Sequence, residues 1–120
     1  MKPGDIYDVV FPYKPPLPPD GTSYKVRPAL IISISPNGTA LALTIKITGY
    51  GPTPKFPNRI RIISWQHAKL DKSSYAKIDS EEYFDLEDAE TYRGTLSPKD
   101  LNNVLTAYIQ LKSSTKSTKQ

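Results

Sequence analysis

Few side chains in this 120-residue chain can carry acid–base or metal chemistry. The chain has no cysteine, which excludes disulfides, thiolate metal sites and cysteine nucleophiles. Its one histidine, His67, titrates near neutrality without help, but one histidine alone makes neither an acid–base pair nor a two-histidine zinc site. We therefore interpret His67 as a surface or packing residue and keep it as the rival catalytic group. We expect no metal and no cofactor.

The basic residues offer a different chemistry, the binding of phosphate. The formal net charge is +4, yet residues 79–90 hold seven of the twelve acidic residues and no basic one. The rest of the chain carries sixteen basic and five acidic residues, a balance of +11. A basic body is typical of proteins that bind nucleic acid, although a soluble surface with one acidic loop has the same composition.

Arg27 and Thr48 stand at the ends of two apolar segments rich in β-branched residues. An arginine suits phosphate because its planar fork donates to two oxygens and stays charged. A threonine hydroxyl can donate to a phosphoryl oxygen. Each also has an ordinary structural interpretation, Arg27 as a basic residue before a proline and Thr48 as a β-branched strand residue.

The elements that must position these residues are short strands separated by turns. Residues 29–34 are continuously apolar, as in a strand buried on both faces, and the Pro-Asn-Gly turn at residues 36–38 makes a hairpin with the next strand. The strands are expected at residues 6–11, 29–34, 40–48, 59–62, 74–78 and 91–96.

The connections between the strands differ in character. Residues 13–21 and 49–57 are loops stiffened by proline. Residues 64–70 are ambiguous and are expected to form at most a short helical turn. The acidic residues 79–90 are expected to be a loop or a poorly ordered connection.

One helix is expected near the end of the chain. Ser97 is a candidate N-cap, Pro98 suits the first helical position, and Asp100 favours the positive helix start. We expect one domain over residues 1–111, a small β-barrel capped by this helix, and a disordered polar tail over residues 112–120. The apolar face of the helix recurs at helical spacing through Leu101, Val104, Leu105, Tyr108 and Leu111.

The cellular location follows from two absences in the sequence. Nothing near the start resembles a signal peptide, and the longest apolar stretch, residues 29–34, is too short to span a bilayer. We expect a cytoplasmic protein.

Four segments, in this order, resemble the MazF/PemK family of toxin–antitoxin systems. They are PGDIY at residues 3–7, KVRPALII at 25–32, IKIT at 45–48 and, more weakly, RGTLSPKDL at 93–101. Gly-Asp and Arg-Pro are common dipeptides, so the resemblance depends on the conjunction of all four in a chain of this length.

The resemblance implies an SH3-like β-barrel with a C-terminal helix, usually a homodimer. It implies a metal-independent endoribonuclease that cuts single-stranded RNA at short sequences, with the family's catalytic arginine on Arg27 and its threonine on Thr48. It also implies a cognate antitoxin whose acidic, partly disordered segment covers the RNA groove. The further residues that we expect to contact RNA are Lys25, Lys46, Tyr50, Arg59 and Arg61.

The implied reaction needs no metal because the 2′-hydroxyl of RNA attacks the adjacent phosphate and leaves a 2′,3′-cyclic phosphate and a 5′-hydroxyl. We assign Arg27 to the phosphoryl charge and to proton donation to the leaving oxygen, and Thr48 to one phosphoryl oxygen. The general base stays unnamed. Some family members carry an acidic residue shortly before the arginine, where this chain has Gly21, Thr22, Ser23 and Tyr24.

Two alternatives remain on the same fold. A CcdB-like protein binds DNA gyrase without catalysis through apolar residues at its C-terminus, whereas this chain ends in a polar Lys/Ser/Thr segment. A non-catalytic RNA-binding barrel is the second alternative, and the missing acidic residue keeps it open.

Overall fold

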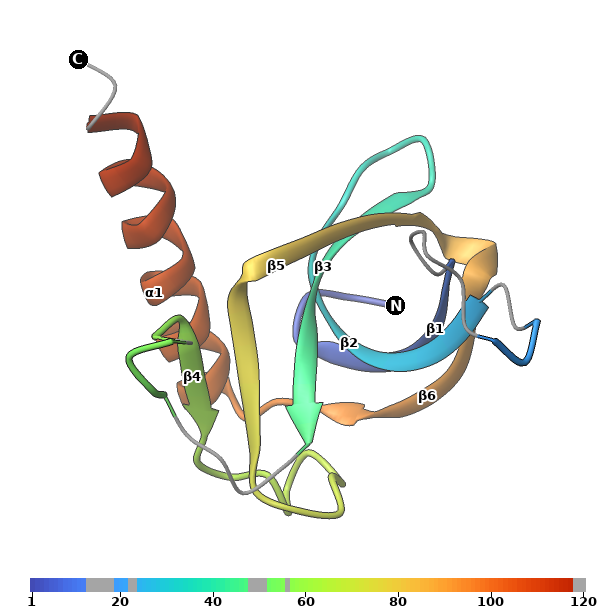
Figure 1. Cartoon of the computed structure of the whole chain (residues 1–120), viewed down its shortest axis with the longest axis horizontal. Helices are drawn as coiled ribbons and strands as arrows, with labels where there is room; N and C mark the ends of the chain where they lie inside the picture. The colour runs from blue at the N-terminus through green and yellow to red at the C-terminus, as the bar shows by residue number, and fades with distance from the viewer. Residues whose placement is uncertain (13–18, 22–23, 48–51, 56, 118–120) are drawn as a thin grey trace.

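The computed structural model describes residues 1–12, 19–21, 24–47, 52–55 and 57–117, and it is mainly β with one C-terminal helix (Figure 1). None of its described helices is long and apolar enough to cross a membrane. The elements are β1 (Asp5–Pro12), β2 (Tyr24–Ile34), β3 (Thr39–Ile47), β4 (Arg59–Ile62), β5 (Ser74–Asp85), the 3-10 turn η1 (Leu86–Asp88), β6 (Ala89–Thr95) and α1 (Pro98–Ser117).

All six strands belong to one antiparallel sheet in the order β4-β5-β3-β2-β1-β6. The predicted hairpin is confirmed as β2 and β3, and its turn is closed by the Ser35 amide, which donates to the Thr39 carbonyl at 2.9 Å. Gly38 makes this turn possible because its φ of 87° lies in the left-handed region.

The sheet curls strongly but does not close, so the predicted SH3-like barrel is not confirmed. Its edge strands β4 and β6 do not pair with each other over the described residues. The curl, seen in Figure 1, brings the second half of β5 back over β1 and β2. It depends on a break in register between β3 and β5, where Leu43 pairs with Glu81 but Ile45 pairs with Ala76. Residues 77–80 of β5 lie opposite the single residue Thr44 of β3, and this bulge bends β5.

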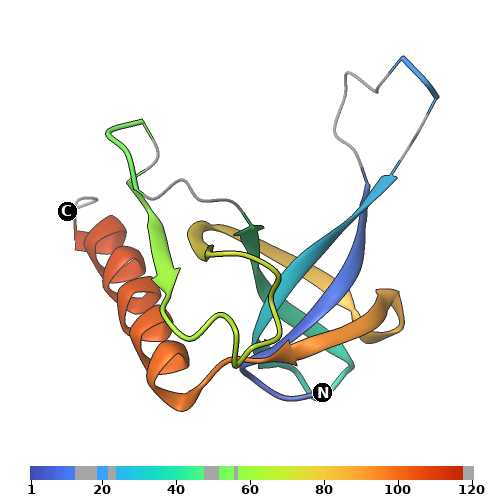
Figure 2. The same cartoon turned by 90° about the horizontal axis from the view of Figure 1, so that it is seen from below.

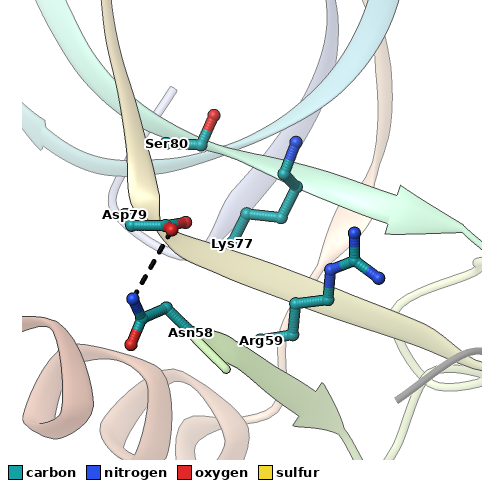
Figure 3. Close-up of a pocket in the computed structure, with 5 residues that line it drawn as sticks. All are labelled: Asn58, Arg59, Lys77, Asp79 and Ser80. Atoms are coloured by element: carbon teal, nitrogen blue, oxygen red, sulfur yellow. Dashed lines mark hydrogen bonds between the residues drawn. The ribbon is translucent and has the colours of Figure 1, made fainter. Parts of the chain in front are cut away.

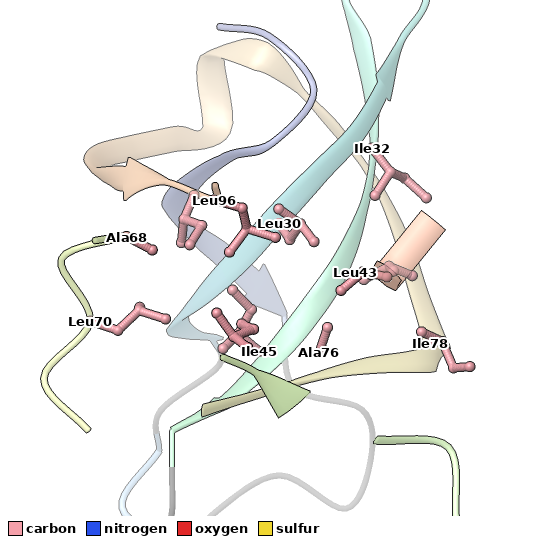
Figure 4. Close-up of a cluster of buried hydrophobic side chains, with 12 residues drawn as sticks. Leu30, Ile32, Leu43, Ile45, Ala68, Leu70, Ala76, Ile78 and Leu96 are labelled. Atoms are coloured by element: carbon pink, nitrogen blue, oxygen red, sulfur yellow. The ribbon is translucent and has the colours of Figure 1, made fainter. Parts of the chain in front are cut away.

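Alternating side chains divide the core into two clusters. In β2, Ala29 and Ile31 face the inside of the curl, where they pack with Val9 and Phe84. Leu30 faces the other side, toward the larger cluster beneath α1 (Figure 4). Both faces of the central strand are therefore buried, as its continuous apolar sequence predicted.

The helix begins as predicted and ends later than expected. The backbone amide of Asp100 donates to the Ser97 hydroxyl at 3.2 Å, so Ser97 is the N-cap. The helix, which packs along β4 and β5 (Figure 2), continues through Ser117, past residue 112 where a frayed tail was expected. For Lys112 that expectation was wrong, because this helical residue pairs with Glu81 at 2.6 Å. Residues 118–120 lie outside the described residues.

The expectation of a loop over residues 79–90 was wrong. This segment completes β5, forms η1 and starts β6. Exposed and buried side chains alternate over residues 83–85 of this segment. The buried one is Phe84, which is 7% exposed and lies opposite Ala40 of β3. Ladder pairing with β3 satisfies the backbone and outweighs the low strand propensity of the acidic residues. Residues 64–70 form consecutive turns.

Candidate nucleic-acid interface

Arg27 lies in β2 on the side of the sheet that faces the inside of the curl. Its Cα partner is Val9 of β1, and the side chains of Ala29 and Ile31 follow on the same face. Arg27 is half-buried at the end of this apolar face. A cation on a partly buried side chain interacts more strongly with a phosphate than a fully exposed one does.

The strands diverge next to Arg27. Over the described residues, β2 and β3 pair no further in this direction than Ala29 and Thr44. Beyond that point β3 keeps its pairing with β5 but no longer pairs with β2 over the described residues. The strands β1 and β2 extend as one two-stranded arm past the end of β3 (Figure 2). Thr48 lies outside the described residues, so its pairing with Arg27 stays a prediction.

A pair of hydroxyl groups lies next to Ala29, the residue that follows Arg27 on the same face of β2. Thr44 shares the face of its Cα partner Ala29, and its Oγ1 donates to the Oγ of Ser80 at 3.0 Å. Thr44 is buried, so this hydrogen bond satisfies a polar group that would otherwise be costly to bury. The bond also ties β3 to the bulge of β5.

The bulge opens a pocket of about 250 Å³ between β4 and β5. Arg59 and Lys77 are Cα partners across these strands, and both side chains line the pocket (Figure 3). Asn58 is fixed by its backbone carbonyl, which accepts from the Ile78 amide at 3.1 Å. Its side-chain amide donates to Asp79 Oδ2 at 3.5 Å, and Ser80 completes the lining.

A second cavity, of about 360 Å³, has the opposite charge. It lies between β1 and the second half of β5, with Val10 and Phe84 in its lining. Glu82, Asp85 and Asp88 also line it, so it is a poor place for a phosphate group. The β4–β5 pocket is therefore the better candidate for contact with a polyanion.

The structure places only some of the predicted RNA contacts. Arg59 lines the pocket, and Arg61 is exposed two residues further along the edge strand β4. Lys25 and Lys46 lie in β2 and β3, and their side chains lie outside what the structure describes. Tyr50 also lies outside the described residues. His67, the rival catalytic group, is exposed in the 64–70 turns.

Sequence reasoning missed Lys77, Asn58, Asp79 and Ser80 as pocket residues. A signal existed for Lys77, because it continues the strand that begins at residue 74 and precedes the acidic segment. No local pattern indicated that β4 would pair with β5 in the register that sets this lysine opposite Arg59.

The Gly-Asp motif has a structural role. Gly4, at φ 98°, donates its amide to the Ile31 carbonyl at 2.8 Å and accepts from the Leu96 amide at 2.9 Å. The Asp5 carboxylate accepts from the Lys2 amide at 3.0 Å and from the Thr95 hydroxyl at 2.8 Å. The motif therefore fastens the N-terminus to β2 and to the end of β6, and it contributes no group to the interface.

Contacts with the end of β6 and with the start of α1 fix the position of the turns at residues 64–70. Gly94 is buried where the Ala68 carbonyl crosses β6, and a Cβ atom at Gly94 would lie 2.0 Å from that oxygen. Asp100, which is 2% exposed, accepts from the amides of Ile63 and Ser64 at 3.0 and 2.8 Å. The weaker RGTLSPKDL motif is thus structural as well.

Comparison with known proteins gives a clear result for structure and none for sequence. No protein-family model and no curated protein matches the chain. Among solved structures, a mycobacterial endoribonuclease matches with a TM-score of 0.65 and 16% identity, over 92% of this chain and 88% of its own. The MazE–MazF structure from Deinococcus radiodurans matches with a TM-score of 0.64 and 19% identity, over 94% and 96% of the two chains.

A third structure, the toxin MazF-mt6 of Mycobacterium tuberculosis, matches with a TM-score of 0.58 and 15% identity over 85% of this chain and 91% of its own. At identities this low the match supports a shared fold alone, and that fold extends over almost the whole length of each protein. The chain thus has the fold of the MazF endoribonuclease toxins, as its four motifs predicted.

Proposed function

We propose that this protein is the toxin of a toxin–antitoxin pair, an endoribonuclease that cuts single-stranded RNA at short sequences. The observation that carries the proposal is Arg27, a half-buried arginine on the inner face of a MazF-like sheet, where β2 and β3 diverge. The basic pocket residues Arg59 and Lys77 support it, since an RNA strand needs several phosphate contacts.

In the proposed reaction the 2′-hydroxyl of RNA attacks its own phosphate, and no metal takes part. Arg27 binds two phosphoryl oxygens and stabilises the charge that builds on them. Thr48 donates to a phosphoryl oxygen. The proton of the 2′-hydroxyl passes to a general base that is not assigned to a residue. Arg27 protonates the leaving 5′-oxygen and regains a proton from solvent, and the products are a 2′,3′-cyclic phosphate and a 5′-hydroxyl.

The proposed partners follow from the similar structures. A mycobacterial endoribonuclease of this fold was solved with its cognate antitoxin, and the Deinococcus protein was solved as MazE–MazF. We propose a cognate antitoxin for this chain whose acidic, partly disordered segment competes with RNA for the basic surface. We also propose a homodimer that acts in the cytoplasm.

The test incubates the purified protein with a long single-stranded RNA in EDTA and maps the ends of the fragments. Cleavage with cyclic-phosphate ends that Arg27→Ala abolishes supports the proposal. The surface variant Lys99→Ala, in the first turn of α1, is the control and should cut normally. Cleavage that survives Arg27→Ala and Thr48→Ala but not His67→Ala would show that the site lies elsewhere.

Two outcomes would replace the proposed function. Intact RNA together with inhibition of DNA gyrase would indicate a CcdB-like inhibitor. Intact RNA that is bound tightly would indicate a non-catalytic RNA-binding protein.

A further inference from the structure

The β4–β5 pocket has two ends of opposite character. The cationic groups of Arg59 and Lys77 extend to one side of β5, whereas Asn58 and Asp79 meet on the other side (Figure 3). A site for a bare phosphate would gain nothing from a carboxylate in its wall, because the two negative charges repel. The ligand that this pocket suits is negative at one end and rich in hydrogen-bond donors at the other.

A nucleotide has this polarity. Its phosphate accepts from an arginine and a lysine, and its base can present N–H groups to a carboxylate. We propose that the β4–β5 pocket binds one guanine nucleotide of the RNA, with the phosphate on Arg59 and Lys77 and the base edge on Asp79. This inference rests on the proposed function and makes Asp79 a determinant of the sequence at which the RNA is cut.

Guanine follows from the hydrogen-bonding capacity of Asp79. An ionised carboxylate has two acceptor oxygens and no donor. Guanine alone among the four bases presents two neighbouring donors, its ring N1–H and its exocyclic amine, on the edge opposite the sugar. Adenine and cytosine place an acceptor beside their amine, and uracil flanks its single N–H with two carbonyls. An acceptor facing the carboxylate is repelled, so these bases fit less well.

The backbone holds the two ends of the pocket at fixed positions. The hydrogen bond from the Ile78 amide to the Asn58 carbonyl joins β4 to the bulge. The Asn58 side chain donates to Oδ2 of Asp79 and orients its carboxylate. The Thr44 hydroxyl binds Ser80 at the other end of the bulge. Each carboxylate oxygen has two lone pairs, and the bond from Asn58 occupies one lone pair of Oδ2. Both oxygens can therefore still accept a hydrogen bond from a base.

The experiment uses mononucleotides, so it does not depend on cleavage. Guanosine 5′-monophosphate, uridine 5′-monophosphate and inorganic phosphate are titrated separately into the isotope-labelled protein, and amide chemical shifts are followed by NMR. We expect guanosine monophosphate to bind roughly tenfold more tightly than uridine monophosphate. The largest shifts should occur at residues 58–59 and 77–80.

Two variants separate the two ends of the pocket. Asp79→Asn should bring the affinity ratio of the two nucleotides close to one and leave the binding of inorganic phosphate unchanged or tighter. Lys77→Gln should weaken both nucleotides and phosphate about equally. The matched controls are Glu87→Gln in η1 and Lys99→Gln in α1, which change the same charges elsewhere and should leave all affinities unchanged.

The proposal is overturned if both nucleotides bind equally to the unaltered protein, or if their shifts lie outside the pocket. It is also overturned if Asp79→Asn keeps the preference for guanosine. RNA cleavage in the EDTA assay together with any of these results leaves the endoribonuclease function standing without this site. A guanosine preference that Asp79→Asn removes, in a protein that cuts no RNA, supports the site while the proposed activity fails.

Discussion

The carbonyl oxygen of Ala68 lies 2.0 Å from the point at which a Cβ atom on Gly94 would stand. No side chain fits there, so Gly94→Ala must displace either β6 or the 64–70 turns. Overpacking of this kind costs about 2–3 kcal/mol of unfolding free energy. Urea unfolding followed by circular dichroism measures the loss.

The matched control is Gly38→Ala, at a glycine with open space around its Cβ position and a φ of 87°. Its cost comes from the left-handed conformation alone and should be about 1 kcal/mol. Equal losses for the two variants would mean that the turns move aside freely and that Gly94 is not a packing requirement.

Asp100→Asn should release the 64–70 turns from the start of α1. The carboxylate accepts from the two amides of Ile63 and Ser64, and an asparagine has one acceptor oxygen and would present an amino group to the other amide. We expect a loss of about 2 kcal/mol, with faster hydrogen exchange at both amides. The exposed Glu87→Gln serves as the control, and unchanged exchange at Ile63 and Ser64 would contradict the assigned role.

Arg27→Lys should lower the rate of RNA cleavage and leave stability nearly unchanged. A lysine keeps the positive charge but loses the planar fork that binds two phosphoryl oxygens. We expect the rate constant for cleavage to fall about 100-fold or more, with a Tm close to that of the unaltered protein. A variant that cuts at the original rate would show that charge alone suffices at this position.

The contact between α1 and β5 should give the protein a distinctive alkaline response. The Tyr108 hydroxyl donates to Glu81 Oε2 at 2.5 Å, and burial and this carboxylate raise the pKa of Tyr108 to about 12. A raised pKa in the folded state means that the stabilisation is complete below pH 10 and is lost as the pH rises toward 12. Tyrosine absorbance should show a late phenol titration that Tyr108→Phe removes.

The same contact also predicts a loss of stability in acid, because the pKa of Glu81 is shifted in the opposite direction to that of Tyr108. Hydrogen bonds from Lys112 and then Tyr108 lower the pKa of Glu81 below its ordinary 4.5. The stabilisation from Glu81 is therefore present above pH 4.5 and is lost as the pH falls through the lowered value. Glu81→Gln should show a smaller decrease in stability over this range than the unaltered protein, and parallel acid-unfolding curves would contradict the contact.

The elements that local patterns specify were predictable from the sequence. The helix start at Ser97 needs only the capping residue and the proline beside it, and the continuous apolar run of β2 needs only its own residues. These signals depend on a few consecutive side chains, and the distant contacts of the fold agree with them.

The missed features depend on contacts between distant segments. The second half of β5 is acidic, and only its register with β3, with Phe84 opposite Ala40, makes it a strand. Whether the sheet closes depends on how two edge strands meet, and no short segment encodes that. Arg59 and Lys77 are neighbours because β4 pairs with β5, and Asp79 and Ser80 join them because the β3–β5 register slips between Leu43 and Ile45; neither pairing could be read from the spacing of these residues.

The crowding at Gly94 bears on how such chains are recognised. Three of the motif residues, Gly4, Asp5 and Gly94, build the scaffold, whereas Arg27 and Thr48 are the motif residues with a proposed chemical role. A homologue that kept these three and replaced Arg27 would be expected to fold and to present the same outline to a binding partner. A match to the scaffold motifs is therefore evidence for the fold, whereas the residues at positions 27 and 48 bear on the proposed activity.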